Sequence, residues 1–280
     1  MRMLVIGGRG MAGHLLIRYF RQVAGADVTY TVRDPQGLPG ELKLDASRLE
    51  DVERIVGDVR PDVIVNAAGV LNHDAESHPT AAYMVNGLLP HWLRHVADRI
   101  GARLIHISSD CVFSGARGGY AESDIPDGTS VYARTKALGE VRDPRHLTIR
   151  TSIIGPEIRA GGIGLLGWFL QQTGKVNGYA QVYWNGVTTL ELAKAVAYAC
   201  AHPEIGGLVH LTAPRSVSKH ELLGLFRQAF DRDDIAIDRV EEPQIDRTLV
   251  KERTDWGYEP QDYPAMLQEL AEWMRQEASA

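Results

Sequence analysis

The chain has 280 residues, 44% hydrophobic and 24% charged, as in an ordinary globular protein of one large or two modest domains. Its 30 Lys and Arg against 36 Asp and Glu give a formal net charge of −6, which argues against nucleic acid as the main partner. No apolar run approaches the roughly 18 residues that a membrane span needs, and the two cysteines, Cys111 and Cys200, form no disulfide framework. We therefore expect a soluble cytoplasmic protein that does not contact a membrane.

Short apolar runs alternate with helix-length amphipathic stretches over the first 150 residues. The runs are rich in Val and Ile and lack strict alternation, which is typical of strands buried on both faces of a parallel sheet. They cover residues 3–6, 28–32, 62–66, 104–107 and 147–149. This order of strands and helices predicts an α/β fold with a doubly wound, Rossmann-type parallel sheet.

Beyond residue 150 the pattern changes. Glycines interrupt the next stretch, and three helical patterns follow near residues 189–201, 217–230 and 263–274. We assign residues 1–150 to a dinucleotide-binding Rossmann domain. Residues 151–280 are predicted to form a smaller substrate-binding lobe that is partly interleaved with the sheet.

The first strand runs directly into a glycine motif, Gly7-Gly8-Arg9-Gly10-Met11-Ala12-Gly13. At the start of an amphipathic helix, such glycines allow a tight turn and let a pyrophosphate approach the helix N-terminus. There the free N–H groups and the helix dipole favour an anion. We therefore predict that Gly7, Arg9, Gly10, Met11 and Gly13 bind a dinucleotide cofactor.

The second strand ends in residues that distinguish the two nicotinamide cofactors. Arg33 follows this strand and, with Arg9 in the glycine motif, could pair with a 2′-phosphate. Asp34 could instead bind the ribose hydroxyls of NAD. The sequence favours NADP(H), with NAD(H) as the alternative.

Two further segments are predicted to contact the cofactor. Asp45, with Ala46 beside it, could accept a hydrogen bond from the adenine amino group. The strand over residues 62–66 ends in a small-residue segment that would lie under the cofactor. This segment consists of Asn66, Ala67, Ala68 and Gly69.

A second group of residues indicates chemistry at a carbonyl. Tyr132 and Lys136 are four residues apart in a predicted helix over residues 130–141, so the phenol and the ammonium share one face. Ser109 follows the strand over residues 104–107 and supplies a hydroxyl at the carboxyl edge of the sheet, where ligands bind in such folds.

Six stretches of the sequence carry a resemblance to a known family: Gly7-Gly8-Arg9-Gly10-Met11-Ala12-Gly13, Asn66-Ala67-Ala68-Gly69, Val85-Asn86, Ser108-Ser109-Asp110-Cys111-Val112-Phe113-Ser114-Gly115, Tyr120-x-Glu122 and Tyr132-Ala133-Arg134-Thr135-Lys136-Ala137-Leu138-Gly139-Glu140. At these stretches the chain resembles the extended short-chain dehydrogenases/reductases, and among them the dTDP-4-dehydrorhamnose reductase family. The resemblance covers the first 150 residues closely and the remainder loosely.

This resemblance implies an NAD(P)H-dependent reductase of a nucleotide-linked 4-keto-6-deoxyhexose, in deoxysugar and polysaccharide biosynthesis. Tyr132 would give a proton to the substrate oxygen, and Lys136 would favour the phenolate and hold the nicotinamide ribose. Lowering a tyrosine pKa from near 10 to about 7 requires roughly 4 kcal/mol. By the same resemblance, Ser109 would hold the carbonyl oxygen and Asn86 a proton-relay water.

The resemblance also implies a set of substrate-binding residues: Ser109, Asp110, Cys111 and Arg247. Related dehydratases carry an Asp-Glu pair where this chain has Asp110-Cys111, so dehydration is not expected. Related epimerase-reductases use a cysteine at this place, together with a later histidine. The chain has no histidine between His146 and His202. We therefore predict reduction without epimerisation.

Three alternatives stay open from the sequence. One is an epimerase-reductase that uses Cys111, and another is a non-catalytic NADP-binding regulatory subunit. Arg247 could also be a solvated surface residue. His91 and His95 are four residues apart on a helix predicted over residues 80–98 but lack a third ligand, so we expect no metal. The expected partner is a small nucleotide sugar, and a homodimer is left open.

Overall fold

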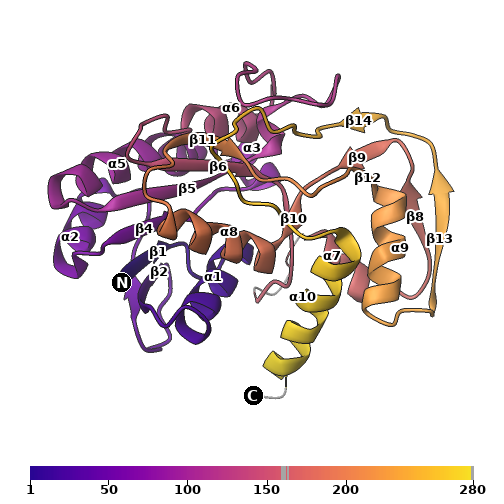
Figure 1. Cartoon of the computed structure of the whole chain (residues 1–280), viewed down its shortest axis with the longest axis horizontal. Helices are drawn as coiled ribbons and strands as arrows, with labels where there is room; N and C mark the ends of the chain where they lie inside the picture. Colours follow the sequence, from indigo (N-terminus) through magenta and orange to yellow (C-terminus); the bar gives the residue numbers. More distant parts are fainter. Residues whose placement is uncertain (159–161, 163, 279–280) are drawn as a thin grey trace.

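A seven-stranded sheet forms the centre of the molecule (Figure 1). The computed structural model describes residues 1–158, 162 and 164–278. The strand order is β11-β6-β5-β4-β1-β2-β3, and every neighbouring pair is parallel. This is the doubly wound sheet that the sequence predicts. The strands are β1 (Arg2–Ile6), β2 (Asp27–Val32), β3 (Glu41–Lys43), β4 (Val63–Asn66), β5 (Arg103–Ser109), β6 (Leu147–Thr151) and β11 (Gly207–His210).

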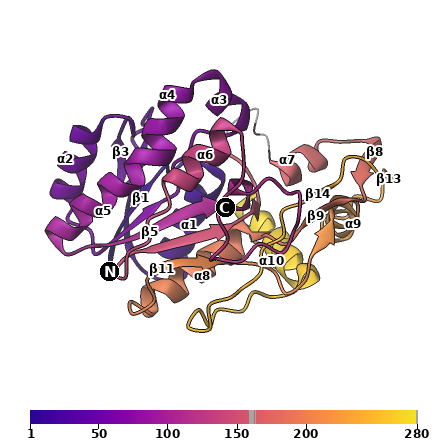
Figure 2. The ribbon, with the colours of Figure 1, turned by 90° about the horizontal axis from the view of Figure 1, so that it is seen from above.

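Helices cover both faces of this sheet. Side chains alternate along a buried strand, so Met3 and Val5 of β1 join one hydrophobic cluster and Leu4 and Ile6 join the other. Helices α1 (Met11–Gln22) and α8 (Thr189–Ala201) pack in the first cluster. Helices α2 (Leu49–Val59) and α5 (Leu89–Ile100) pack in the second. Figure 2 shows α2, α5 and the short helix α6 (Val131–Leu138) on one side of the sheet and α8 on the other.

The segment before α5 departs from a regular helix. The sequence predicts one helix over residues 80–98, but α4 (Pro79–Ala82) continues into the π-helix η1 (Tyr83–Leu88) before α5 begins. Pro90 occupies the first turn of α5 and has no N–H, so the regular hydrogen-bond ladder cannot continue through it. Another short helix, α3 (Asn72–Ser77), precedes α4.

The part of the chain after β6 forms the smaller lobe. Its small sheets have the orders β12-β9-β14, β13-β8 and β10-β7. The helices predicted near 217–230 and 263–274 are α9 and α10. The lobe elements are β7 (Ile153–Ile154), α7 (Leu165–Leu170), β8 (Gly174–Tyr179), β9 (Val182–Trp184), β10 (Val187–Thr188), β12 (Val217–Ser218), α9 (Lys219–Ala229), β13 (Ile235–Val240), β14 (Ile245–Asp246) and α10 (Tyr263–Ala278).

The smaller lobe does not occupy all of the chain after residue 150. Strand β11 returns to the main sheet and pairs with β6, and α8 packs against α1. The segments between β6 and α8 and after β11 therefore project from the sheet, as Figure 1 shows for α9 and β13.

A buried ion pair connects the end of α6 to the edge of the sheet formed by β6 and β11. Arg150 of β6 is completely buried, and its Nε and Nη2 donate to the two carboxylate oxygens of Glu140 at 2.8 and 2.6 Å. Ser108 of β5 donates to the same carboxylate at 2.9 Å. Nη1 of Arg150 lies 2.9 Å from Nε2 of His210 in β11. The guanidinium thus joins β5, β6, β11 and the end of α6.

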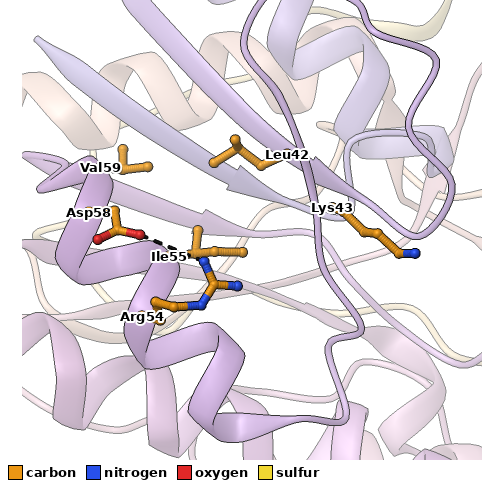
Figure 3. Close-up of a pocket in the computed structure, with 6 residues that line it drawn as sticks. All are labelled: Leu42, Lys43, Arg54, Ile55, Asp58 and Val59. Atoms are coloured by element: carbon orange, nitrogen blue, oxygen red, sulfur yellow. Dashed lines mark ion pairs between the residues drawn. The ribbon is translucent and has the colours of Figure 1, made fainter.

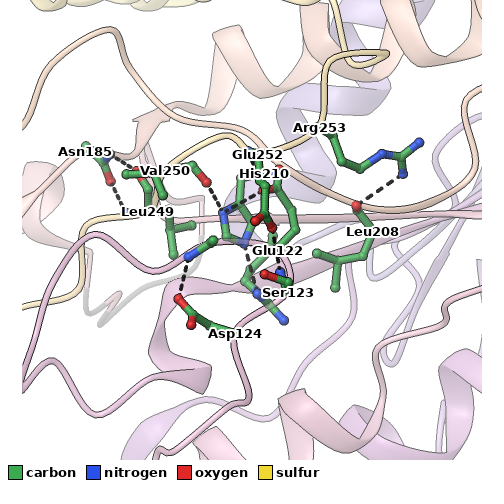
Figure 4. A network of polar contacts seen from close by, with 12 residues as sticks. Glu122, Ser123, Asp124, Asn185, Leu208, His210, Leu249, Val250, Glu252 and Arg253 are labelled. Carbon is green, nitrogen blue, oxygen red and sulfur yellow. Dashed lines mark hydrogen bonds and ion pairs between the residues drawn. The ribbon is translucent and has the colours of Figure 1, made fainter.

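The network continues into the C-terminal part of the chain (Figure 4). The ring of His210 bonds through Nδ1 to the carbonyl oxygen of Val250 at 2.8 Å. Because an arginine N–H can only donate, Nε2 of His210 is the acceptor and Nδ1 carries the proton. The Glu122 carboxylate accepts from the backbone N–H of His210 at 3.0 Å and of Glu252 at 2.7 Å. These bonds fasten the segment after β14 to the main sheet.

Replacing Arg150 by methionine should destabilise the protein strongly. The variant leaves the Glu140 carboxylate buried without its partner, which typically costs about 3–5 kcal/mol. Urea unfolding followed by circular dichroism measures the change in the free energy of unfolding. Arg239→Met, which breaks an exposed pair with Glu241, is the matched control and should change it far less. Equal effects of the two variants would contradict the role given to the buried pair.

The folded protein should become less stable as the pH decreases, because of His210. Burial lowers the pKa of His210 to about 4, although the nearby Glu122 carboxylate opposes this shift. The unfolded chain therefore takes up a proton below about pH 6.5 that the folded chain resists until about pH 4. As the pH decreases from 6.5 to 4, the free energy of unfolding should therefore decrease by up to about 3 kcal/mol because of this residue. Urea titrations from pH 7.5 to 4 should show a shallower pH dependence in His210→Gln than in the wild type, and identical slopes would refute the assignment.

Candidate active site

The predicted site residues gather at the carboxyl ends of the parallel strands. The glycine motif follows β1, and the segment from Asn66 to Gly69 follows β4, the neighbouring strand. The chain leaves β1 and β4 toward opposite sides of the sheet, and this switch point is where doubly wound folds bind ligands. The segment after β4 is held against the end of β1, just before the glycine motif, because the Ala67 N–H donates to the carbonyl oxygen of Ile6 at 3.0 Å.

The glycine loop is packed too closely for side chains. Gly7 has a φ of +89°, and the Gly10 N–H donates to its carbonyl oxygen at 3.0 Å. A Cβ atom on Gly13 would lie 2.2 Å from the same oxygen, and one on Gly7 would lie 2.9 Å from the backbone of Ala68. Helix α1 begins immediately afterwards with no side-chain cap and no acidic residue in its first turn. Its N–H groups are therefore available to an anion such as a pyrophosphate, so the loop fits a dinucleotide.

Arg9 has a partner that the sequence did not reveal. Its guanidinium Nη2 lies 3.0 Å from Oε1 of Glu41, on β3. Strand β3 pairs with β2, and the exposed Arg33 follows the end of β2. Glu41 is distant in sequence from Arg9, and the pairing of β2 with β3 brings it to the glycine loop.

The remaining residues assigned to the cofactor form hydrogen bonds within the loops at this edge. Asp45 accepts from the N–H and the hydroxyl of Ser47 at 3.0 and 2.7 Å, and these bonds lower the pKa of Asp45. Asn66 is buried, lies 3.1 Å from the ring nitrogen Nδ1 of His106 and accepts from the Ala68 N–H at 3.2 Å. Ala46 packs against the cluster around α2.

Strand β5 and helix α6 bring the three predicted catalytic residues together. Ser109 is the last residue of β5, and its hydroxyl acts on the Tyr132 phenol, where it opposes the rise in the pKa of Tyr132. The Lys136 ammonium donates to the backbone carbonyl of Ile107, also in β5, at 2.7 Å. The main-chain bond fixes the lysine against the sheet one turn of helix after the tyrosine.

Burial controls the charge state of these groups. Burial raises the pKa of Tyr132, and the negative charges that Cys111 and Asp110 can carry add to the effect. The direction is opposite to the lowering expected from a neighbouring lysine, and the phenol keeps its proton at neutral pH in the protein alone. Burial lowers the pKa of Lys136 to about 8, while Glu140 opposes the shift.

Asn86 lies inside the π-helix η1 and is completely buried. Its side-chain nitrogen donates to the Val70 carbonyl at 2.9 Å and to the Thr135 hydroxyl at 3.1 Å, and its oxygen accepts from the Val70 N–H at 2.8 Å. The amide thus joins the loop after β4 to helix α6. Single π-turns in helices often mark functional sites.

The turn after Ser109 faces two cations from the smaller lobe. Ser109 caps the 3-10 helix η2 (Asp110–Val112), accepting from the Cys111 N–H at 3.1 Å and donating to the Asp110 carboxylate at 3.0 Å. Burial raises the pKa of Asp110, whereas Arg247 and Lys219 act against that shift. Arg247 follows β14 and donates through Nε to the Phe113 carbonyl at 3.0 Å. Arg247 therefore lies at the predicted site.

Lys219 was not found from the sequence. It is the first residue of α9, and its ammonium lies 4.8 Å from the centroid of the Trp184 ring. The only signal in the sequence is its position after Ser218, which caps a helix by accepting from the Glu221 N–H at 3.1 Å. A lysine in a first helical turn opposes the helix dipole.

A hollow elsewhere on the surface contains none of the predicted site residues. Figure 3 shows it beside β3 and α2, where it has a volume of about 400 Å³ and an ion pair of 3.7 Å between Arg54 and Asp58. Across residues 1–158, 162 and 164–278, no group of three or more His, Cys, Asp or Glu side chains is placed to hold a metal. No helix in the same ranges is long and apolar enough to cross a membrane.

The sheet order, the glycine loop and the Ser109, Tyr132 and Lys136 set define a Rossmann-type protein of the short-chain dehydrogenase/reductase class. Within this class, residues 1–248 match the family described as RmlD substrate binding domain. The chain belongs to that family.

The sequences of known proteins are similar to different lengths of this chain. It is 32% identical over 195 residues to the dTDP-4-dehydrorhamnose reductase of Salmonella typhimurium, covering 65% of this chain and 64% of that protein. It is 36% identical over 140 residues to the bovine (Bos taurus) methionine adenosyltransferase 2 subunit beta, covering 50% of this chain and 41% of the subunit. The chain therefore spans less than two thirds of either relative.

The likeness in fold covers the full length of a solved structure. A crystal structure of a dTDP-4-dehydrorhamnose reductase from Clostridium acetobutylicum superposes with a TM-score of 0.82, covering 98% of this chain and 100% of that one. The two sequences are 18% identical, so this likeness is one of fold.

Proposed function

We propose that the protein is an NADPH-preferring reductase of a nucleotide-linked 4-keto-6-deoxyhexose. The observation that carries this proposal is the placement of Ser109, Tyr132 and Lys136 on β5 and α6, at the edge of the sheet where the glycine loop lies. Membership of the RmlD substrate binding domain family supports a nucleotide sugar as the substrate. The product would be a deoxysugar donor for polysaccharide synthesis.

The chain's own residues would bind the substrate ketone and supply its proton. NAD(P)H, when bound at the glycine loop, supplies the hydride. The Ser109 hydroxyl would hold the carbonyl oxygen, and Tyr132, which burial keeps protonated, would donate its proton to that oxygen. Lys136 uses one N–H on the Ile107 carbonyl, so two N–H groups are available to the nicotinamide ribose and to stabilise the phenolate that forms.

The state of Cys111 supports reduction without epimerisation. Epimerisation requires a base that removes a proton from carbon. Burial raises the pKa of Cys111 to about 12, and Asp110 reinforces the shift. The thiol is therefore neutral at pH 7 and is a poor base.

The complete catalytic set also favours an enzyme over a regulatory subunit, although one relative is named as the beta subunit of methionine adenosyltransferase 2. A protein that only binds NADP does not require a serine, a tyrosine and a lysine in this arrangement. Turnover of a nucleotide sugar discriminates the two functions.

Removing the Tyr132 hydroxyl should abolish turnover without loss of the cofactor. Tyr132→Phe should reduce kcat by about 10²–10⁴-fold, the usual contribution of a positioned proton donor. The assay follows NADPH oxidation with dTDP-, UDP-, GDP- and CDP-linked 4-keto-6-deoxyhexoses, and fluorescence titration follows NADPH binding. Tyr179→Phe, at an exposed tyrosine, is the control. Full activity of Tyr132→Phe would contradict the proposed reaction.

Arg33 should determine the preference for NADPH. An arginine that pairs with the 2′-phosphate contributes about 1.5–3 kcal/mol, so Arg33→Ala should raise the Kd of NADPH about 10- to 100-fold. The Kd of NADH should change less than about threefold, since NADH lacks that phosphate. Arg54→Ala, on α2, provides a matched control. Equal losses for the two cofactors would show that Arg33 does not contact the 2′-phosphate.

A further inference from the structure

Lys219 is a half-buried cation without a charged partner in contact. Among residues 1–158, 162 and 164–278, no hydrogen bond or ion pair involves its ammonium, which lies against the Trp184 ring. Burial lowers the pKa of Lys219 to about 8, and Asp110 and Cys111 oppose the shift. Keeping a lysine here costs free energy twice, through desolvation and through the dipole of α9.

The fold directs Lys219 and Arg247 to the same place. Lys219 follows β12 and Arg247 follows β14, the two strands that flank β9 in one small sheet. Ser218 and Asp246, the residues just before the two cations, both pair with Tyr183 of β9. Both cations also interact electrostatically with the Asp110 and Cys111 turn that follows the serine at the end of β5. The lobe therefore presents a pair of cations to the catalytic turn from two separate segments.

The charges at this turn are not balanced by the protein. Two cations face one carboxyl group, Asp110, and burial shifts that carboxyl toward its neutral form. Arg247 uses only its Nε, in the bond to Phe113, so its terminal nitrogens are free of any described partner. An anionic ligand would satisfy both cations.

We infer that Lys219, together with Arg247, binds the sugar-bearing phosphate of the substrate's diphosphate. This inference rests on the proposed function, in which the ketone lies between Ser109 and Tyr132. The phosphate is attached to C1 of the pyranose, across the ring from the C4 ketone. A cation that faces the catalytic turn therefore lies about the width of one sugar ring from the reacting carbon. The sugar-bearing phosphate must lie at that distance. The Trp184 ring, 4.8 Å from the Lys219 ammonium, supports the charge at this place.

The test compares nucleoside diphosphates with monophosphates. Full-length protein saturated with NADP⁺ is titrated calorimetrically with dTDP, UDP, GDP and CDP and with the corresponding monophosphates. In Lys219→Met, the Kd of the tightest diphosphate should rise about 10- to 100-fold, as expected for one charge-assisted contact. The Kd of its monophosphate should change less than about threefold, because the monophosphate lacks the sugar-bearing phosphate. Lys219→Arg should restore most of the diphosphate affinity.

Two controls separate binding from structure and from turnover. Lys175→Met, on the exposed face of β8, should leave all affinities unchanged, and Tyr132→Phe should bind the diphosphate like the wild type. Unchanged diphosphate affinity in Lys219→Met, equal losses for mono- and diphosphate, or a wild type that binds no diphosphate would each overturn the inference. If diphosphate binding depends on Lys219 but no nucleotide sugar is reduced, the proposed reaction fails and the inference stands. If the wild type reduces a nucleotide sugar and Lys219→Met keeps its affinity, only the inference fails.

Discussion

The buried guanidinium of Arg150 is the interaction on which the rest of the arrangement depends. It holds Glu140 at the end of α6, next to the lysine of the catalytic set, and it bonds to His210 in β11. His210 in turn bonds to the segment that follows Arg247. One desolvated charged group, each of whose three nitrogens has a partner, therefore sets the distance between the helix that carries Tyr132 and the lobe that would bind the substrate.

The two halves of the site obtain their precision in different ways. The glycine loop is fixed by backbone packing, since a Cβ on Gly13 would meet the Gly7 carbonyl. Ser109 and Lys136 are fixed by hydrogen bonds to the backbone and to Asp110, such as that from Lys136 to the Ile107 carbonyl. The cations of the lobe have weaker supports, an aromatic ring for Lys219 and one carbonyl for Arg247. Free cations at the end of a rigid frame suit a ligand that brings the opposite charge.

Local sequence patterns predict five of the seven strands of the main sheet, α8, α9, α10 and the residues at the carboxyl edge, because each depends on short-range periodicity or on a motif of a few residues. They do not predict β3 or β11. The same patterns could not reveal the ion pair of Glu41 with Arg9 or the electrostatic interaction of Lys219 with Asp110. Those contacts join segments that only tertiary structure brings together. The raised pKa of Tyr132 was also missed, since its cause is burial and not its neighbours in sequence.

The position of β11 has a consequence for how the chain folds. Strand β6 pairs with β11 on its outer side, and α1 packs against α8. Both partners follow the segment that builds part of the smaller lobe. While the chain leaves the ribosome, the first 150 residues therefore carry an open sheet edge at β6 and an uncovered apolar face on α1. The lobe segment is a long loop that must close before the sheet is complete, which makes the outer edge the slow, high-contact-order step of folding.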